Sequence, residues 1–399
     1  MTSLIMLAIM AGCVTLLYLK GTLVMGISMV LNAMLAGFIG LAFSEVLSRL
    51  LIGYSPGIAP WALMICFLLL FVLAFAVFQT VTMQLAKEKV DLGPLAELIG
   101  KIVCGVVLGY IVTGQLLVAA AMAPLPAQYP YQRFDDRNPN PSQPNKPLLS
   151  PDGFVTGLFE TISKGSFSAI GSPQSFAVLH AGYLDQLHLN RLKKDVPVRT
   201  SQPAIDVERN GVWYAPDNLR DTDGKPVSAS PGERFILVRA GIRKRALKDA
   251  GKFTLAQIRL ICGPKNDPEN PLAGQGQAVY PTGYIGANRH LERKSLAEVI
   301  TIEASDVKGD AQNIDLAFSV PMNVTPLVIQ FKGNNVVQLS AIATGEDAPQ
   351  PIPFGSAAPP QTRSNDRQKK ATSQQSSPRG RPPLSDISRS VVGPALDEN

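Results

Sequence analysis

The chain has 399 residues, and its 37 lysines and arginines outnumber its 31 aspartates and glutamates. Only nine charged residues come before Pro124, whereas the part after it has the composition of a soluble protein. We therefore expect a membrane third, residues 1–123, joined to a polar two-thirds, and this excludes a chain that is soluble throughout.

The cysteines exclude two further kinds of site. Cys13, Cys66 and Cys104 lie in apolar stretches, so only Cys262 belongs to the polar part. An intramolecular disulfide is impossible there, and no Cys-x-x-Cys pair exists for zinc or redox chemistry.

Four apolar stretches predict membrane-spanning helices. The longest uncharged run extends from Leu50 to Ala86, and its centre is apolar on every face. A helix needs about 20 such residues to cross a bilayer, where only helices and closed barrels satisfy their own backbone hydrogen bonds. We place the four spans at about Ser3–Leu19, Thr22–Phe43, Trp61–Met83 and Leu95–Ala123.

Small residues recur in two of these spans. Ala36 and Gly40 in the second span, and Gly105 and Gly109 in the fourth, have the small-xxx-small spacing that lets helices approach closely. We interpret the four residues as helix-packing positions, and we expect the protein to associate with itself through such faces.

Two charged pairs stand at the ends of spans. Glu45 and Arg49 follow the second span, and Glu97 and Lys101 open the fourth. Residues four apart share one face of a helix, so both pairs are predicted to be interfacial ion pairs. An ion pathway is the less favoured interpretation, because such pathways use ionisable residues inside the spans.

Residues 124–153 contain eight prolines, which predicts an extended linker rather than a packed element. A helical connector is expected over residues 154–195, opened by Ser150 as N-cap and Pro151 at the first helical position. Its second helix, at about residues 174–194, contains His180 and His188. We interpret these as surface histidines, because no third ligand for a metal is found.

From Pro197 the apolar residues alternate with polar ones. Ile205–Tyr214 predicts a hairpin around Asn210-Gly211, which suits a type I′ turn. Residues 314–320 and 327–331 predict a second hairpin late in the chain. With the other candidate strands, residues 235–240, 258–262, 299–303 and 336–339, the pattern predicts an antiparallel sandwich over residues 196–345.

The last segment, residues 346–399, has nine prolines, seven lysines and arginines and one aromatic residue. This composition predicts a disordered basic tail. Such a tail could meet acidic polymers, but a merely solvated tail is favoured, and no nucleic-acid partner is expected.

The first third resembles the colicin V production protein family. The likeness is carried by the four spans, by Lys20-Gly21 closing the first pair, and by the fourth span Leu98-Ile-Gly-Lys-Ile-Val-Cys-Gly-Val-Val-Leu-Gly-Tyr110. The resemblance implies a bacterial inner-membrane protein linked to bacteriocin or toxin production and to envelope stress.

The polar part is similar to telokin-like, immunoglobulin-type domains. This likeness is carried by residues 232–238, 315–321 and 326–331, and it covers about residues 200–342. It implies an immunoglobulin-like β fold but supplies no function of its own.

No motif for catalysis or for a cofactor is present. Gly165-Ser-Phe-Ser-Ala169 lacks the final glycine of a nucleophile elbow, Gly274-Gln-Gly276 lacks the Lys-Ser/Thr of a phosphate loop, and no His-Glu-x-x-His occurs. We therefore expect a protein that is not an enzyme and has no cofactor or metal.

Charge favours one orientation of the spans. The two loops that would face the cytoplasm contain Lys20, Lys87, Lys89 and Lys101, against Arg49, Arg133 and Arg137 on the other side. With four spans, this orientation places the C-terminal domain in the periplasm.

The sequence leaves three functions open. The favoured one is a membrane-anchored scaffold that contacts the lipid bilayer and an envelope protein. An oligomeric pore or secretion component, lined by Gln79, Thr80, Thr113 and Gln115, is the second. A cytoplasmic-facing adaptor is the third, if the topology is reversed.

Overall fold

The computed structural model describes residues 2–85, 93–166, 175–264, 274–307 and 309–354 of the chain. The expectations for the charged loop at residues 87–92 and for the basic tail from residue 355 onward lie outside these described residues. All of the described residues belong to one compact unit, Met1–Ala357.

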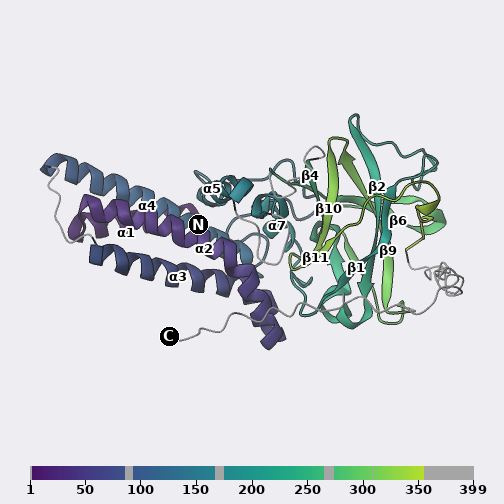
Figure 1. Cartoon of the computed structure of the whole chain (residues 1–399), viewed down its shortest axis with the longest axis horizontal. Helices are drawn as coiled ribbons and strands as arrows, with labels where there is room; N and C mark the ends of the chain where they lie inside the picture. Colours follow the sequence, from purple (N-terminus) through teal and green to yellow (C-terminus); the bar gives the residue numbers. More distant parts are fainter. Residues whose placement is uncertain (1, 86–92, 167–174, 265–273, 308, 355–399) are drawn as a thin grey trace, which may run out of the picture. The chain divides into compact units, whose positions relative to one another are not determined.

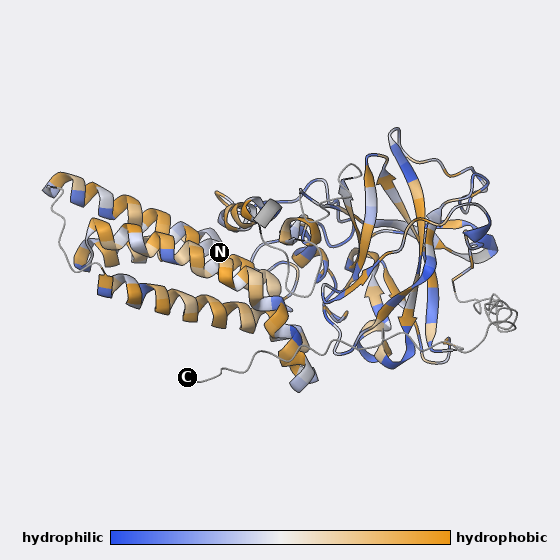
Figure 2. Cartoon of the chain, viewed as in Figure 1, coloured by the Kyte–Doolittle hydropathy of each residue, from blue (hydrophilic) through white to orange (hydrophobic). Residues whose placement is uncertain are grey.

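Four helices in the first third are long and apolar enough to cross a membrane. They are α1, Thr2–Lys20, α2, Leu23–Tyr54, α3, Ala59–Leu85, and α4, Pro94–Met122. Figure 2 shows apolar residues along most of their length, as expected for helices that face lipid. The predicted helical region with four apolar helices is thus confirmed, and it fits a multi-pass membrane protein.

Helix α2 continues well past the predicted end of its span. Its 32 residues correspond to about 48 Å at 1.5 Å per residue, more than the roughly 30 Å of a hydrocarbon core. The helix begins with Thr22 as N-cap, whose hydroxyl accepts from the Met25 amide at 3.2 Å. Its C-terminal turns contain Glu45, so they carry this residue out toward the rest of the protein.

Three short helices connect the membrane helices to the β region: α5, Pro151–Ser166, α6, Phe176–Leu179, and α7, Tyr183–Leu189. Helix α5 starts at Pro151, as the sequence predicts, but the expected N-cap is wrong: Ser150 has a left-handed backbone with φ 43°, and its hydroxyl bonds Asp152 Oδ1 instead of a backbone amide. The single second helix that we expected is wrong, because Gly182 adopts a left-handed backbone with φ 63° and separates α6 from α7. Glycine adopts this conformation at little cost, so the chain turns there.

The proline-rich segment before α5 is packed, which contradicts the expected extended linker. Phe134 is buried in a cluster with Leu189 and Leu192. The Thr2 hydroxyl of α1 donates to the carbonyl of Pro130. Prolines exclude regular helix and strand here, but one aromatic side chain and a few polar contacts suffice to fix the segment.

The β region has three antiparallel sheets. Figure 1 labels strands of the two larger ones. A five-stranded sheet has the order β1-β2-β9-β6-β7, a four-stranded sheet the order β11-β10-β4-β5, and β3 pairs with β8. The strands are β1, Ile205–Tyr214, β2, Glu233–Arg243, β3, Lys252–Thr254, β4, Ile258–Pro264, β5, Gln277–Val279, β6, Pro281–Ile285, β7, Leu291–Arg293, β8, Val299–Thr301, β9, Ala311–Pro321, β10, Val324–Phe331, and β11, Asn335–Gln338.

Short helical turns join some of these strands. They are the helix α8, Leu247–Ala250, and the 3-10 turns η2, Lys244–Ala246, η3, Leu255–Gln257, η4, Ala287–Arg289, and η5, Gly345–Asp347, while η1, Pro56–Ile58, joins α2 to α3. The expected antiparallel β region is confirmed.

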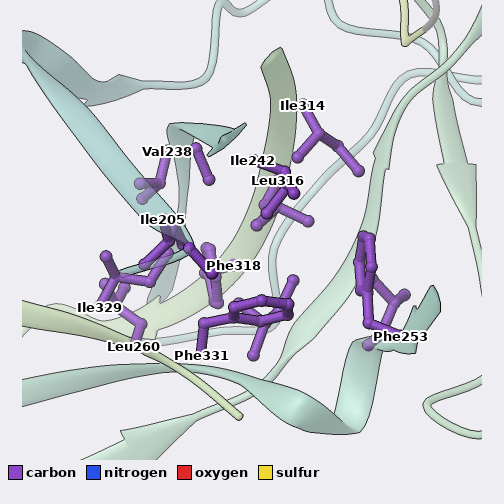
Figure 3. Close-up of a cluster of buried hydrophobic side chains, with 14 of the residues drawn as sticks. Ile205, Val238, Ile242, Phe253, Leu260, Ile314, Leu316, Phe318, Ile329 and Phe331 are labelled. Carbon is purple, nitrogen blue, oxygen red and sulfur yellow. The ribbon is translucent and has the colours of Figure 1, made fainter. Parts of the chain in front are cut away.

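One buried core draws side chains from both larger sheets. Leu316 and Phe318 of β9 belong to the same apolar cluster as Leu260 of β4 and Phe331 of β10 (Figure 3). The Phe331 ring meets the Phe253 ring edge to face at 5.5 Å. Alternation along each strand turns one set of apolar side chains toward this core.

The expected hairpin around Asn210-Gly211 is wrong. Residues 205–214 form the single strand β1, in which both Val207 and Val212 pair with β2 across a register shift. The long neighbouring strand offers more backbone partners than a local turn does, and the exposed residues between the two valines form a bulge.

The late hairpin is also wrong, because β9 and β10 belong to different sheets. β9 pairs with β2 and β6, whereas β10 pairs with β4 and β11. The two strands reach the shared core from separate sheets, which buries the apolar face of each without a hydrogen bond between them.

The start of the expected tail packs on the β region, so the predicted boundary at residue 346 is wrong. The Ile352 amide donates to Asp315 Oδ2 at 2.8 Å, and the Phe354 amide donates to the Ile285 carbonyl at 2.8 Å. Phe354 also meets the Tyr284 ring at 5.4 Å. These contacts satisfy backbone groups that a disordered tail would leave to water.

Candidate functional site

The candidate site is the junction at which helix α2, the connector and the β region meet. Glu45 of α2 has its Oε2 atom 3.4 Å from Nε2 of His180, the residue that ends α6. The His180 ring is buried and packs between Phe176, at 4.7 Å, and Tyr183, at 5.1 Å. The ring is thereby held in one orientation toward the membrane helix.

The second nitrogen of His180 faces the connector. Nδ1 lies 3.3 Å from Gln186 Oε1, which already accepts a bond of 2.5 Å from Nη2 of Arg259. His180 is therefore the donor in this contact. Nδ1 thus carries a hydrogen, and Nε2 on the other side of the ring faces the Glu45 carboxyl group.

Arg259 of β4 joins the connector to the β region. It donates to the carbonyls of Leu179, at 2.9 Å, and Ala181, at 3.0 Å, and to Oε1 of Gln330 on β10, at 2.5 Å. Burial lowers the pKa of this guanidinium. Five donors in a fixed planar fork allow one arginine to satisfy the carbonyls at the end of α6 and an amide of the sheet together.

A second buried network lies beside the first. Arg133 pairs with Asp185 at 2.6 Å and donates to the Tyr131 hydroxyl at 3.1 Å. The Tyr131 hydroxyl donates to Asp152, and burial, followed by the charge of Asp152, raises the pKa of this tyrosine.

Arg191 ties the connector to the end of α4. Its Nη1 donates to the Ala120 carbonyl at 3.2 Å, and its Nη2 lies 3.1 Å from Nδ1 of His188. Burial lowers the pKa of Arg191 to about 10, and burial together with Arg191 and Arg133 holds the pKa of His188 well below its usual value. A cation at a helix C-terminus is favoured by the exposed carbonyls and the helix dipole.

An apolar groove of about 380 Å³ opens beside the Glu45–His180 contact. Its walls come from α2, α3, α5 and α6, and its polar end consists of Glu45, Arg49 and His180. Phe38 and Phe159 meet across it at 5.4 Å. The groove is thus a hydrophobic pocket whose polar side chains belong to the junction.

No family model, curated protein or solved structure matches this chain.

One of the two predicted ion pairs forms between the expected residues. Lys101 Nζ lies 3.2 Å from Glu97 Oε1, at the start of α4. Glu45 instead contacts His180, and no ion pair joins it to Arg49 within the described ranges. The i, i+4 spacing allows the expected pair, but a buried histidine from the connector offers Glu45 a partner that is shielded from water.

The predicted packing residues contact neighbouring helices of the same chain. A Cβ atom on Gly105 would lie 2.6 Å from Val14 Cα of α1, and one on Gly109 would lie 2.5 Å from Met10 Cα. On α2, a Cβ atom on Gly40 would lie 2.9 Å from the Phe67 ring of α3, and Ala36 is fully buried. These positions permit close approach of backbones.

The four residues named for a pore make contacts inside the helical region. Gln79 accepts a bond of 3.2 Å from Asn32 of α2. Thr80 and Thr113 donate to carbonyls of their own helices, four residues back, at 2.8 and 2.7 Å. Gln115 is buried against Gly37 of α2.

Sequence reasoning missed most of the junction. His180 and His188 were expected at the surface, but both are buried, so that interpretation is wrong. Gln186 and Arg259 were not predicted, because they bind each other and Gln330 across long stretches of the chain. A local signal is the placement of polar residues among closely spaced apolar ones in α7, and of His180 directly after the apolar helix α6.

Proposed function

We propose that this protein is a multi-pass inner-membrane scaffold that fixes its β domain to the ends of its membrane helices. The observation that carries the proposal is the unbroken series of polar contacts from Glu45 of α2 through His180 and Gln186 to Arg259 of β4. A flexible tether needs no such series. A scaffold gains from it, because the orientation of a binding surface is then set in advance.

A second link supports the same conclusion. Arg191 binds the last turn of α4, and Arg133 of the segment after α4 binds Asp185 of α7. Separating a buried ion pair is costly, because it leaves an uncompensated buried charge. The two contacts therefore resist opening more than exposed pairs do. The membrane helices and the connector are thus joined at two separate points.

The biological setting of the proposal rests on the sequence resemblance. We propose a member of the colicin V production protein family with a role in envelope maintenance, stress response or toxin production. Its β domain would be an immunoglobulin-like sandwich in the periplasm. The two antiparallel sheets that share a core are compatible with such a sandwich. An envelope protein is the proposed partner.

Distance measurement between two spin labels tests the scaffold directly. Cysteines replace Tyr54, at the exposed end of α2, and Val336, on the exposed face of β11, in a chain whose four native cysteines are alanine. We expect a single narrow distance distribution in lipid nanodiscs, and a broad one after Glu45→Ala and Arg259→Ala are combined. The matched control is Arg49→Ala, which removes an exposed charge of the same helix and should leave the distribution narrow.

A broad distribution in the unaltered chain would contradict the scaffold. Flux of ions through liposomes tests the rival function, an oligomeric pore. Reproducible flux that is lost on Gln115→Leu would contradict a scaffold without transport activity. Protease protection of a tag after Asn399, compared between spheroplasts and lysed cells, decides whether the β domain faces the periplasm or the cytoplasm.

A further inference from the structure

A basic pocket of about 520 Å³ lies apart from the junction groove. It is formed where three parts of the chain meet: the turn between α2 and α3 around Pro56 and Gly57, the residues that follow α4 from Pro124, and the segment from Arg191 to Ser201 with the end of α8. Its size suits a small ligand or a headgroup.

The charges that line this pocket are mostly positive. The lining has two carboxylates, Asp195 and Asp249, and five cationic side chains: Arg191, Lys193, Lys194, Arg199 and Lys248. One of these carboxylates is already engaged, because Asp249 Oδ2 accepts the Ser201 amide at 3.0 Å and also its hydroxyl. Lys194 and Lys248 are exposed and form no ion pair in the part of the chain that the structure describes.

Arg199 is the decisive residue. It is only 6% exposed, yet across the described residues its guanidinium has neither a hydrogen bond nor an ion pair. Burial lowers the pKa of Arg199, and the negative charge of Glu45 partly offsets this effect. Glu45 itself is paired with His180. A buried cation without a partner is costly, so its position at a pocket wall indicates an anion that binds there.

The walls of the pocket also indicate where this anion comes from. Pro56 and Gly57 stand between the end of α2 at Tyr54 and the start of α3 at Ala59, and Pro124 follows the end of α4 at Met122. Helices α2, α3 and α4 are each long and apolar enough to cross a membrane, so the three helix ends that border the pocket lie on the membrane's polar side and not in the hydrocarbon core. Basic pockets between such ends bind anionic headgroups.

We propose that this pocket binds a phosphate group, supplied by the headgroup of an anionic phospholipid. The phosphate would face the Arg199 guanidinium, with Lys194 and Lys248 at the rim. Bidentate arginine and flexible lysines are the usual partners of phosphate oxygens. The inference uses the four membrane helices but not the scaffold role, so its failure would leave the scaffold proposal intact.

Ligand titration of the purified full-length protein in zwitterionic detergent tests this assignment. The probes are phosphatidylglycerol, phosphatidylcholine and inorganic phosphate, and binding is followed by native mass spectrometry and by the thermal unfolding temperature. We expect phosphatidylglycerol to bind and to raise this temperature, whereas phosphatidylcholine and inorganic phosphate do not at the same concentrations.

Variants assign the binding to the pocket. Combined Lys194→Gln and Lys248→Gln, two exposed changes that leave the fold intact, should weaken binding of phosphatidylglycerol roughly 20- to 30-fold, at about fivefold for each lysine. Arg199→Gln should abolish it. Lys225→Gln, an exposed lysine of the β domain outside the pocket, is the matched control and should leave binding unchanged.

Three results would overturn the proposal. The first is equal binding of phosphatidylglycerol and phosphatidylcholine. The second is unchanged binding in both pocket variants. The third is that inorganic phosphate binds, that phosphatidylglycerol does not, and that Arg199→Gln abolishes the binding of phosphate. This result would assign the pocket to a soluble phosphate instead.

Discussion

The Nε2 atom of His180 lies 3.4 Å from the Oε2 atom of Glu45, and this contact joins membrane helix α2 to the connector that leads to the β region. His180 is 3% and Glu45 21% exposed at the side chain, so the pair is largely shielded from water. Such a pair contributes to stability chiefly because either partner alone would be left with a buried polar group.

We expect Glu45→Ala to lower the free energy of unfolding by about 2–3 kcal/mol, somewhat less than for a fully buried pair because Glu45 is partly exposed. Glu45→Gln keeps an oxygen that accepts from His180 and should cost less. Denaturation of the full chain in detergent, followed by Trp61 and Trp213 fluorescence, measures both.

Arg49→Ala is the control for this prediction, because it removes an exposed charge on the same helix. Its effect should stay within about 0.5 kcal/mol. If Arg49→Ala destabilised the protein as much as Glu45→Ala, the stabilising partner of Glu45 would be Arg49, and the importance of the histidine contact would be refuted.

The glycines of α4 provide a second prediction. Gly105→Leu or Gly109→Leu places a side chain against the backbone of α1, 2.6 Å from Val14 Cα or 2.5 Å from Met10 Cα at the Cβ atom alone. Backbone atoms cannot yield as a flexible side chain does, so each change should cost at least about 1–3 kcal/mol. Thermal unfolding in detergent, with Trp61 as reporter, measures the loss.

Gly12→Leu on α1 is the matched control for the two glycine variants. A Cβ atom at Gly12 meets no other atom within 4 Å, so the larger side chain enters free space. Its unfolding temperature should equal or exceed that of the unaltered chain, since leucine favours helix more than glycine does. Equal losses in all three variants would show that helix α1 does not pack as described.

Local patterns account for what the sequence predicted well. The four membrane helices follow from long apolar runs, and the start of α5 follows from Pro151, whose fixed φ suits the first helical position. Most strands follow from alternation that repeats every two residues, as in β9 from Ile314 to Val320. In each case the information lies within a dozen residues.

The junction could not be predicted because its partners are distant in sequence. Nothing near His180 identifies Glu45 as its partner, and nothing near Arg259 identifies Gln186. The wrong hairpin at Asn210-Gly211 has the same origin: the dipeptide favours a turn locally, but pairing of β1 with β2 prevails. Tertiary contacts decide such choices, and one sequence does not show them.

The pair of Arg239 and Asp315 is a third test, inside the β region. Arg239 donates from Nε and Nη2 to the two carboxylate oxygens at 2.7 and 2.8 Å, and Asp315 Oδ2 also accepts the Ile352 amide. Asp315→Ala should therefore lower the free energy of unfolding by about 3–5 kcal/mol. Urea unfolding with Trp213 as reporter, in a Trp61→Phe chain, measures it.

The same change should release the segment that precedes the basic tail. Limited proteolysis within residues 345–354 is expected to accelerate in Asp315→Ala, because the Ile352 amide loses its acceptor. Asp223→Ala is the control, since its ion pair with Lys225 is well exposed and worth at most about 1 kcal/mol. Unchanged cleavage and stability in Asp315→Ala would show that this pair is not a structural anchor.

Lys332 makes the stability of the β region depend on pH. Its side chain is buried and donates to the carbonyls of Asp249 and, at 2.7 Å, Lys252, and burial lowers its pKa to about 7. The unfolded chain holds this proton up to its ordinary pKa of about 10.4. Between these two values the unfolded state binds more protons than the folded state, so stability rises with pH.

We expect a slope of up to about 1.4 kcal/mol per pH unit from this lysine between roughly pH 7 and pH 10, and none below pH 7, where both states are protonated. Lys332→Met should remove the slope, although it also loses two hydrogen bonds, whereas Lys225→Met at an exposed site should retain it. Urea unfolding at several pH values, again with Trp213 as reporter, measures the three chains. An identical slope in Lys332→Met and the unaltered chain would show that Lys332 stays charged in the folded protein, with its burial offset by the two carbonyls.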